Sequence, residues 1–123
     1  LLDKVNSEVK NILGNVVYLD KSTQHMFELN NKVRLICVPD YGVDNADQFL
    51  GFVSGILSQD HDLQQMYFDS FLDIAHLRDA DITPALKKLD TLSQQFKIDF
   101  VLSVSMDEAD LPESAKSLIA ISL

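Results

Sequence analysis

The chain has 123 residues, of which 46% are hydrophobic and 24% charged, a composition typical of one globular domain with a proper core. Nineteen acidic and ten basic residues give a net charge of −9, which disfavours binding to nucleic acid or to an anionic membrane surface. The single cysteine, Cys37, excludes an internal disulfide and favours a cytoplasmic protein.

The first third of the chain alternates between short apolar runs and polar turns. Residues 1–13 carry apolar side chains at helical spacing, and Gly14 follows as the expected C-cap. After this helix, three short apolar runs predict strands, at residues 16–19, 25–29 and 33–38. Because Asn tolerates a positive φ, Asn30 and Asn31 favour a hairpin turn between the last two runs. Such a hairpin would make the sheet mixed, and a fully parallel sheet is the alternative.

A second helix is predicted over residues 44–57, opened by Asp44. Apolar side chains recur along one of its sides, at Ala46, Phe49, Leu50, Val53, Ile56 and Leu57. Gly51 and Gly55 are four residues apart and would allow another backbone to approach closely. The alternative is an ordinary helix packed against a sheet.

The strongest pattern is a strand, a helix and a second strand between residues 66 and 105. Residues 66–69 read Met-Tyr-Phe-Asp, and residues 100–105 form a second apolar strand. Between them, Pro84 fits the first turn of a helix over residues 84–96. Its apolar stripe consists of Leu86, Leu89, Leu92 and Phe96. This order predicts a βαβ unit with parallel strands.

Together these elements predict a single α/β domain over residues 1–123. We expect a mostly parallel sheet of about five strands, with helices on both faces. A short helix over 113–117 and a strand over 118–121 would complete it. Because the chain begins with Leu rather than Met, a fragment of a larger protein is one interpretation.

Several well-known site motifs are absent from the sequence. It contains no phosphate-binding loop with Lys-Ser/Thr, no G-x-G-x-x-G, no H-E-x-x-H and no G-x-S-x-G. His25, His61 and His76 are far apart without metal-ligand spacing, and we interpret them as surface or boundary residues.

Four aspartates lie at or just after the ends of predicted strands, namely Asp20, Asp40, Asp69 and Asp107. In a parallel sheet these carboxylates would gather at the carboxyl edge, where open α/β sheets bind ligands. Oxygen ligands suit Mg²⁺, and the hydroxyls of Ser103 and Ser105 would add contacts to a cofactor or phosphate. Aspartate is also a favoured turn residue, so scattered turns are the alternative.

The run from residue 66, including Asp69, Ser70, the helix over 84–96 and the strand over 100–105, resembles the second half of a RecA-like P-loop NTPase core. The resemblance covers about half of the chain, residues 63–123. It implies that Asp69 helps to hold Mg²⁺ and that Ser103 or Ser105 senses phosphate. The family's phosphate-binding loop is missing, so we expect no nucleotide hydrolysis by this chain alone.

Two functions follow from these observations. Residues 40–81 carry nine aspartates against Arg78 alone, a charge of −8. We therefore expect a non-catalytic interaction or regulatory domain that docks a basic protein partner, assisted by the helix over 44–57. Excision of this domain from a larger NTPase-like protein is one interpretation. The alternative is an Mg²⁺-dependent domain, enzymatic or not, that binds a nucleotide or phosphorylated ligand through the strand-end aspartates.

Overall fold

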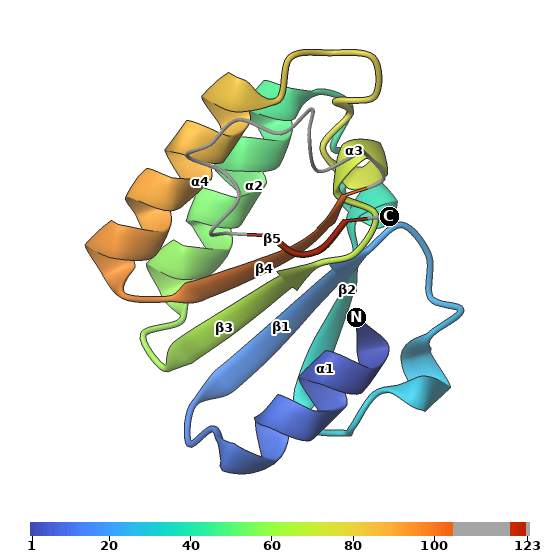
Figure 1. Cartoon of the computed structure of the whole chain (residues 1–123), viewed down its shortest axis with the longest axis vertical. Helices are drawn as coiled ribbons and strands as arrows, with labels where there is room; N and C mark the ends of the chain where they lie inside the picture. Colours follow the sequence, from blue (N-terminus) through green and yellow to red (C-terminus); the bar gives the residue numbers. More distant parts are fainter. Residues whose placement is uncertain (105–118, 123) are drawn as a thin grey trace.

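The structure, a computed structural model, describes residues 1–104 and 119–122. The described chain forms a parallel five-stranded sheet in the order β2-β1-β3-β4-β5 (Figure 1). The strands are β1 (Asn15–Asp20), β2 (Val33–Cys37), β3 (Leu63–Phe68), β4 (Asp99–Val104) and β5 (Ile119–Ser122). The α-helices are α1 (Leu2–Glu8), α2 (Ala46–Gln59), α3 (Phe71–Ile74) and α4 (Thr83–Phe96), and the 3₁₀-helices are η1 (Val9–Asn11), η2 (Met26–Glu28) and η3 (Val38–Tyr41). The α/β class with a parallel sheet is therefore confirmed.

The predicted βαβ unit is present as β3, α4 and β4. The two strands are adjacent and parallel, with Met66 opposite Phe100. Within α4 the predicted stripe is buried as far as Leu92, but Phe96 is 46% exposed. The helix ends there because Lys97 adopts a left-handed conformation, with φ of 56°. Phe96, the last residue of the helix, is therefore not part of its buried stripe.

Helix α2 begins two residues later than predicted. Its N-cap is Asn45, whose side-chain oxygen accepts a hydrogen bond from the Gln48 backbone N–H at 2.9 Å. The predicted apolar stripe packs on the sheet, with Phe49 and Val53 fully buried. A Cβ at Gly51 or at Gly55 would meet nothing within 4 Å in the described chain, so no other backbone approaches there and the ordinary packing of this helix on the sheet is confirmed.

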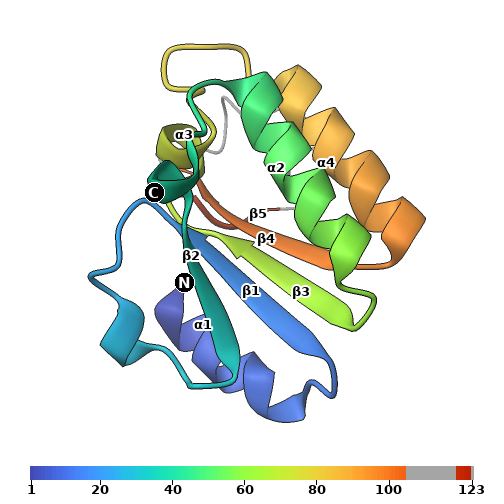
Figure 2. The same cartoon turned by 180° about the vertical axis from the view of Figure 1, so that it is seen from behind.

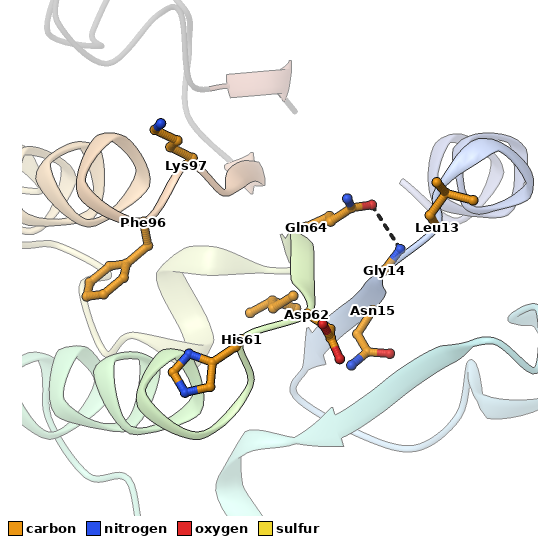
Figure 3. Close-up of a pocket in the computed structure, with 9 residues that line it drawn as sticks. Leu13, Gly14, Asn15, His61, Asp62, Gln64, Phe96 and Lys97 are labelled. Atoms are coloured by element: carbon orange, nitrogen blue, oxygen red, sulfur yellow. Dashed lines mark hydrogen bonds between the residues drawn. The ribbon is translucent and has the colours of Figure 1, made fainter.

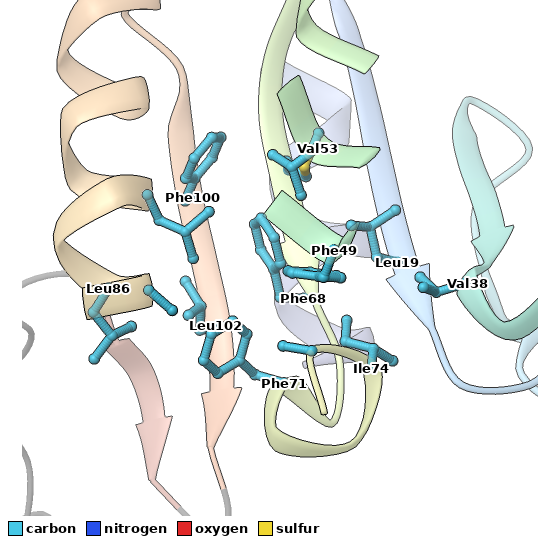
Figure 4. Close-up of a cluster of buried hydrophobic side chains, with 14 of the residues drawn as sticks. Leu19, Val38, Phe49, Val53, Phe68, Phe71, Ile74, Leu86, Phe100 and Leu102 are labelled. Carbon is cyan, nitrogen blue, oxygen red and sulfur yellow. The ribbon is translucent and has the colours of Figure 1, made fainter. Parts of the chain in front are cut away.

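Helices cover both faces of the sheet, as predicted. Helices α2 and α4 lie side by side on one face, and α1 lies on the other (Figures 1 and 2). The core under α2 and α4 centres on Phe68, whose ring meets the rings of Phe49, Phe71 and Phe100 edge-to-face at 5.3–6.2 Å (Figure 4). Each such pair is worth about 0.5–1.5 kcal/mol beyond the area that it buries.

The helix predicted over residues 1–13 is shorter than expected. Helix α1 passes into η1, and its buried Val5 and Val9 pack with Tyr18 and Tyr67 on the second face of the sheet. Gly14 is not a C-cap. It lies where a Cβ would come within 2.2 Å of the Asp62 backbone oxygen, so the close approach of two chain segments requires glycine.

The predicted hairpin between residues 25–29 and 33–38 is wrong. The first run forms η2 rather than a strand, and β2 pairs in parallel with β1, placing Val33 opposite Val16. Asn30 does make a turn, because its side-chain oxygen accepts a hydrogen bond from the Lys32 N–H at 2.9 Å. That turn joins η2 to a parallel strand, so the described sheet is not mixed.

The strand order reverses between β1 and β3. From β1 the chain moves outward to β2 and then crosses back over β1 to β3. The segments that follow β1 and β3 therefore run in opposite directions at the carboxyl edge. Open parallel sheets bind ligands in the crevice that such a reversal creates.

Among the described residues, no helix combines the length and the apolar character needed to cross a bilayer.

Candidate functional site

Two of the predicted aspartates meet at this reversal point. Asp20 is the last residue of β1 and is 1% exposed. Asp69 directly follows β3, and its backbone N–H donates a hydrogen bond to the Leu19 carbonyl at 2.9 Å. This bond extends the β1–β3 ladder by one residue and fixes the two carboxylates on neighbouring strand ends.

A third side chain, His25, joins them from the loop after β1. Its Nδ1 lies 2.8 Å from Asp20 Oδ2 and 3.9 Å from Asp69 Oδ2. One ligand atom from each of the three residues lies within 4.8 Å of the others. The second oxygen of Asp20 accepts a hydrogen bond from the Lys21 backbone N–H at 2.7 Å, which holds the carboxylate in this orientation.

Two hydroxyl groups contact the Asp69 carboxylate and hold its orientation. The buried Tyr18 hydroxyl donates a hydrogen bond to its Oδ2, and the Ser70 hydroxyl lies 3.4 Å from its Oδ1. Burial first, and then the Asp69 carboxylate, raises the pKa of Tyr18 well above its ordinary value, so the phenol stays a donor at neutral pH. Ser70 has φ of 57° and ψ of 53°, a left-handed turn that directs the chain into α3.

The distances between the three donors are close to those of a metal coordination shell. With metal–ligand distances of about 2.1 Å, neighbouring ligand atoms at angles of about 90–120° lie about 3.0–3.6 Å apart. The distances of 2.8 and 3.9 Å from His25 Nδ1 bracket that range. Small side-chain shifts would therefore bring Asp20, His25 and Asp69 onto one cation, with the imidazole binding it through an unprotonated Nδ1.

The surroundings of the three donors are acidic. Seven of the nine aspartates between residues 40 and 81 lie between the end of β2 and the first turn of α2, or between the end of β3 and the start of α4, and so toward the carboxyl edge. They are Asp40, Asp44, Asp47, Asp69, Asp73, Asp79 and Asp81. Asp73 is already paired, since Arg78 Nε lies 2.8 Å and Lys21 Nζ 3.5 Å from its oxygens. Its hydrogen bond with Arg78 lowers the pKa of the Asp73 carboxyl.

The remaining predicted site residues have different outcomes. Ser103 is buried on β4, and because Phe68 pairs with Leu102 it lies level with Asp69 on the next strand. Asp40 is exposed on η3 and lies beside Cys37, whose thiol pKa is raised by burial and by that carboxylate. It does not belong to the group of three. Ser105 and Asp107, like the predicted helix over 113–117, lie outside the described residues.

A pocket of about 550 Å³ lies at the opposite, amino edge of the sheet (Figure 3). Its wall is held by the Gly14 N–H, which donates to the Gln64 side-chain oxygen at 3.0 Å, and His61 and Lys97 lie apart on its rim. None of the three donors that converge at the carboxyl edge lines this pocket. Volume alone therefore does not make this pocket the functional site.

His25 and Tyr18 are the site residues that the sequence did not indicate. His25 lies five positions beyond Asp20 in a loop without periodicity, and Tyr18 reads as an ordinary strand residue. Their only sequence signal is proximity to a strand-terminal aspartate. Comparison of the chain with protein-family models, with curated proteins and with solved structures finds no match.

Proposed function

We propose that this chain is a ligand-binding α/β domain that holds a divalent cation through Asp20, His25 and Asp69, and a phosphorylated small molecule or nucleotide through that cation. The observation that carries the proposal is the convergence of two carboxylates and an imidazole within 4.8 Å. Their position at the reversal of strand order supports it, because ligands of open parallel sheets bind at that point.

Electrostatics supports the same proposal. A carboxylate that is 1% exposed, as Asp20 is, has lost most of its hydration and needs a positive partner or a metal ion. Asp69 adds a second carboxylate nearby, and the edge around both is rich in further aspartates. A divalent cation would neutralise this charge and present a positive centre to an anionic ligand.

The donor set also bears on the kind of cation. Carboxylates alone suit Mg²⁺, the cofactor that the strand-end aspartates favour. The imidazole of His25 adds a nitrogen donor, which fits Mn²⁺ or Zn²⁺ better. We therefore propose that the site prefers Mn²⁺ or Zn²⁺ to Mg²⁺.

A bound phosphate would need contacts in addition to the cation. In the proposed relationship to a RecA-like P-loop NTPase core, Asp69 would help to hold the cation and Ser103 on the neighbouring strand would contact phosphate. The sequence contains no phosphate-binding loop. The chain would therefore supply the acidic half of the site, with another segment or chain supplying the phosphate cradle.

Isothermal titration calorimetry of the chain with MnCl₂ and with MgCl₂ tests the proposal. We expect one Mn²⁺ per chain, weaker binding of Mg²⁺, and loss of Mn²⁺ binding in Asp69→Asn. The matched control is Asp62→Asn, which removes the same charge at the amino edge and should bind Mn²⁺ like the parent. Binding that is unchanged in Asp69→Asn would contradict the proposal.

A second candidate function is docking of a basic protein partner. The exposed aspartates of the carboxyl edge favour it, among them Asp44, Asp47, Asp79 and Asp81. Replacing these four by Asn should then abolish binding of a Lys-rich model peptide and leave Mn²⁺ binding intact. Equal peptide binding by the parent and the fourfold variant would exclude this function for that surface.

A further inference from the structure

Two tyrosines lie side by side beneath the carboxyl edge, on the α1 face of the sheet. Tyr18 on β1 pairs directly with Tyr67 on β3, and their rings are stacked with centroids 6.1 Å apart at an angle of 18°. Both residues are 0% exposed. They are therefore closely matched in burial, sheet position and packing.

The two hydroxyl groups have different partners. Tyr18 donates to Asp69 Oδ2, at the carboxyl edge. The Tyr67 hydroxyl lies 2.9 Å from Glu8 Oε2 and 2.9 Å from Gln65 Oε1, and so links β3 to α1. One hydroxyl thus faces the proposed cation site, and the other stabilises the docking of a helix.

The oxygen that accepts from Tyr18 is also the one that faces His25. Asp69 Oδ2 lies 3.9 Å from His25 Nδ1. The carboxylate follows the last residue of β3 and is 17% exposed, so side-chain rotation would otherwise turn this oxygen toward solvent. The hydrogen bond from a rigid, stacked ring opposes that rotation.

We propose that Tyr18 is a positioning residue of the cation site, whose hydroxyl holds Asp69 Oδ2 toward Asp20 and His25. This inference rests on the proposed function. Partners that orient metal ligands from outside the coordination shell typically contribute a factor of about 10–100 to metal affinity. Loss of the Tyr18 hydroxyl alone should have an effect of that size.

The test compares Tyr18→Phe with Tyr67→Phe by calorimetric titration of each full chain with MnCl₂, together with its melting temperature. Each variant loses one buried hydroxyl and keeps the stacked ring. We expect Mn²⁺ to bind about 10–100-fold more weakly to Tyr18→Phe and with the parent affinity to Tyr67→Phe. The melting temperature alone would not distinguish the two, because both lose a hydrogen bond.

Each outcome decides the inference. Equal Mn²⁺ affinity of the parent and Tyr18→Phe, or equal weakening in both variants, would overturn the positioning role while the proposed function stands. A parent chain that binds no Mn²⁺ would remove the proposed function and the positioning role together. Binding that is weakened only in Tyr18→Phe supports both.

Discussion

Replacing Leu89 by alanine tests the packing of α4 on the sheet. Leu89 lies in the middle of α4, is 0% exposed and belongs to the main core cluster with Leu86 and Phe100. The substitution removes three buried carbons, worth about 2.4 kcal/mol at about 0.8 kcal/mol each. A cavity adds to this loss, so we expect the free energy of unfolding to fall by about 2–5 kcal/mol.

The expected loss is large enough to measure easily. Unfolding entropy is about 2.1 cal/mol/K per residue, so for 123 residues each kcal/mol shifts the melting temperature by about 4 °C. The predicted fall is therefore about 8–20 °C, followed by circular dichroism and checked by urea unfolding. The exposed neighbour Lys88→Ala is the control and should stay within about 0.5 kcal/mol of the parent. An unchanged urea midpoint for Leu89→Ala would refute the packing of this stripe.

Three further substitutions have effects of defined sign. Gly14→Ala should lower the free energy of unfolding by about 1–3 kcal/mol, because its Cβ would lie 2.2 Å from the Asp62 backbone oxygen. Gly51→Ala, where nothing lies within 4 Å, should raise the free energy of unfolding by about 0.5–1 kcal/mol. Equal effects of the two substitutions in urea unfolding would contradict the close approach of Gly14 to Asp62. A hydrogen bond from the Gln65 side chain is the largest cause that lowers the pKa of Glu8 in the folded chain. The stabilising effect of Glu8 is therefore present above the ordinary glutamate pKa and is lost as pH falls through the folded value. Glu8→Gln should therefore flatten the fall of melting temperature between about pH 5 and 3, and an unchanged slope would contradict this contribution.

The elements with a clear period were predictable from the sequence. The stripe of Leu86, Leu89 and Leu92 identified α4, and the apolar runs on either side identified β3 and β4. The prediction of a strand over 25–29 was wrong. Its apolar residues suggested a buried strand, whereas Met26 and Phe27 are 48% and 91% exposed in η2. A short apolar run does not reveal whether tertiary contacts will bury it.

The candidate site was predictable only in part. Asp20 and Asp69 follow from a rule about strand ends, because parallel strands bring their carboxyl ends to one edge. Asp40 fits the same rule, but it lies in η3, beyond the end of β2, and is not one of the three converging donors. His25 reaches the site through a folded loop, and such loop geometry leaves no pattern in the sequence.

The central claim is that Asp20, His25 and Asp69 hold a divalent cation. Melting temperature against Mn²⁺ at constant ionic strength tests it most directly, for the parent, Asp69→Asn and Asp62→Asn. At about one hundred times the dissociation constant, binding should add about 2.7 kcal/mol, a rise of about 10 °C, in the parent and in Asp62→Asn only. A flat curve for the parent, or the same saturable rise in Asp69→Asn, would contradict the claim.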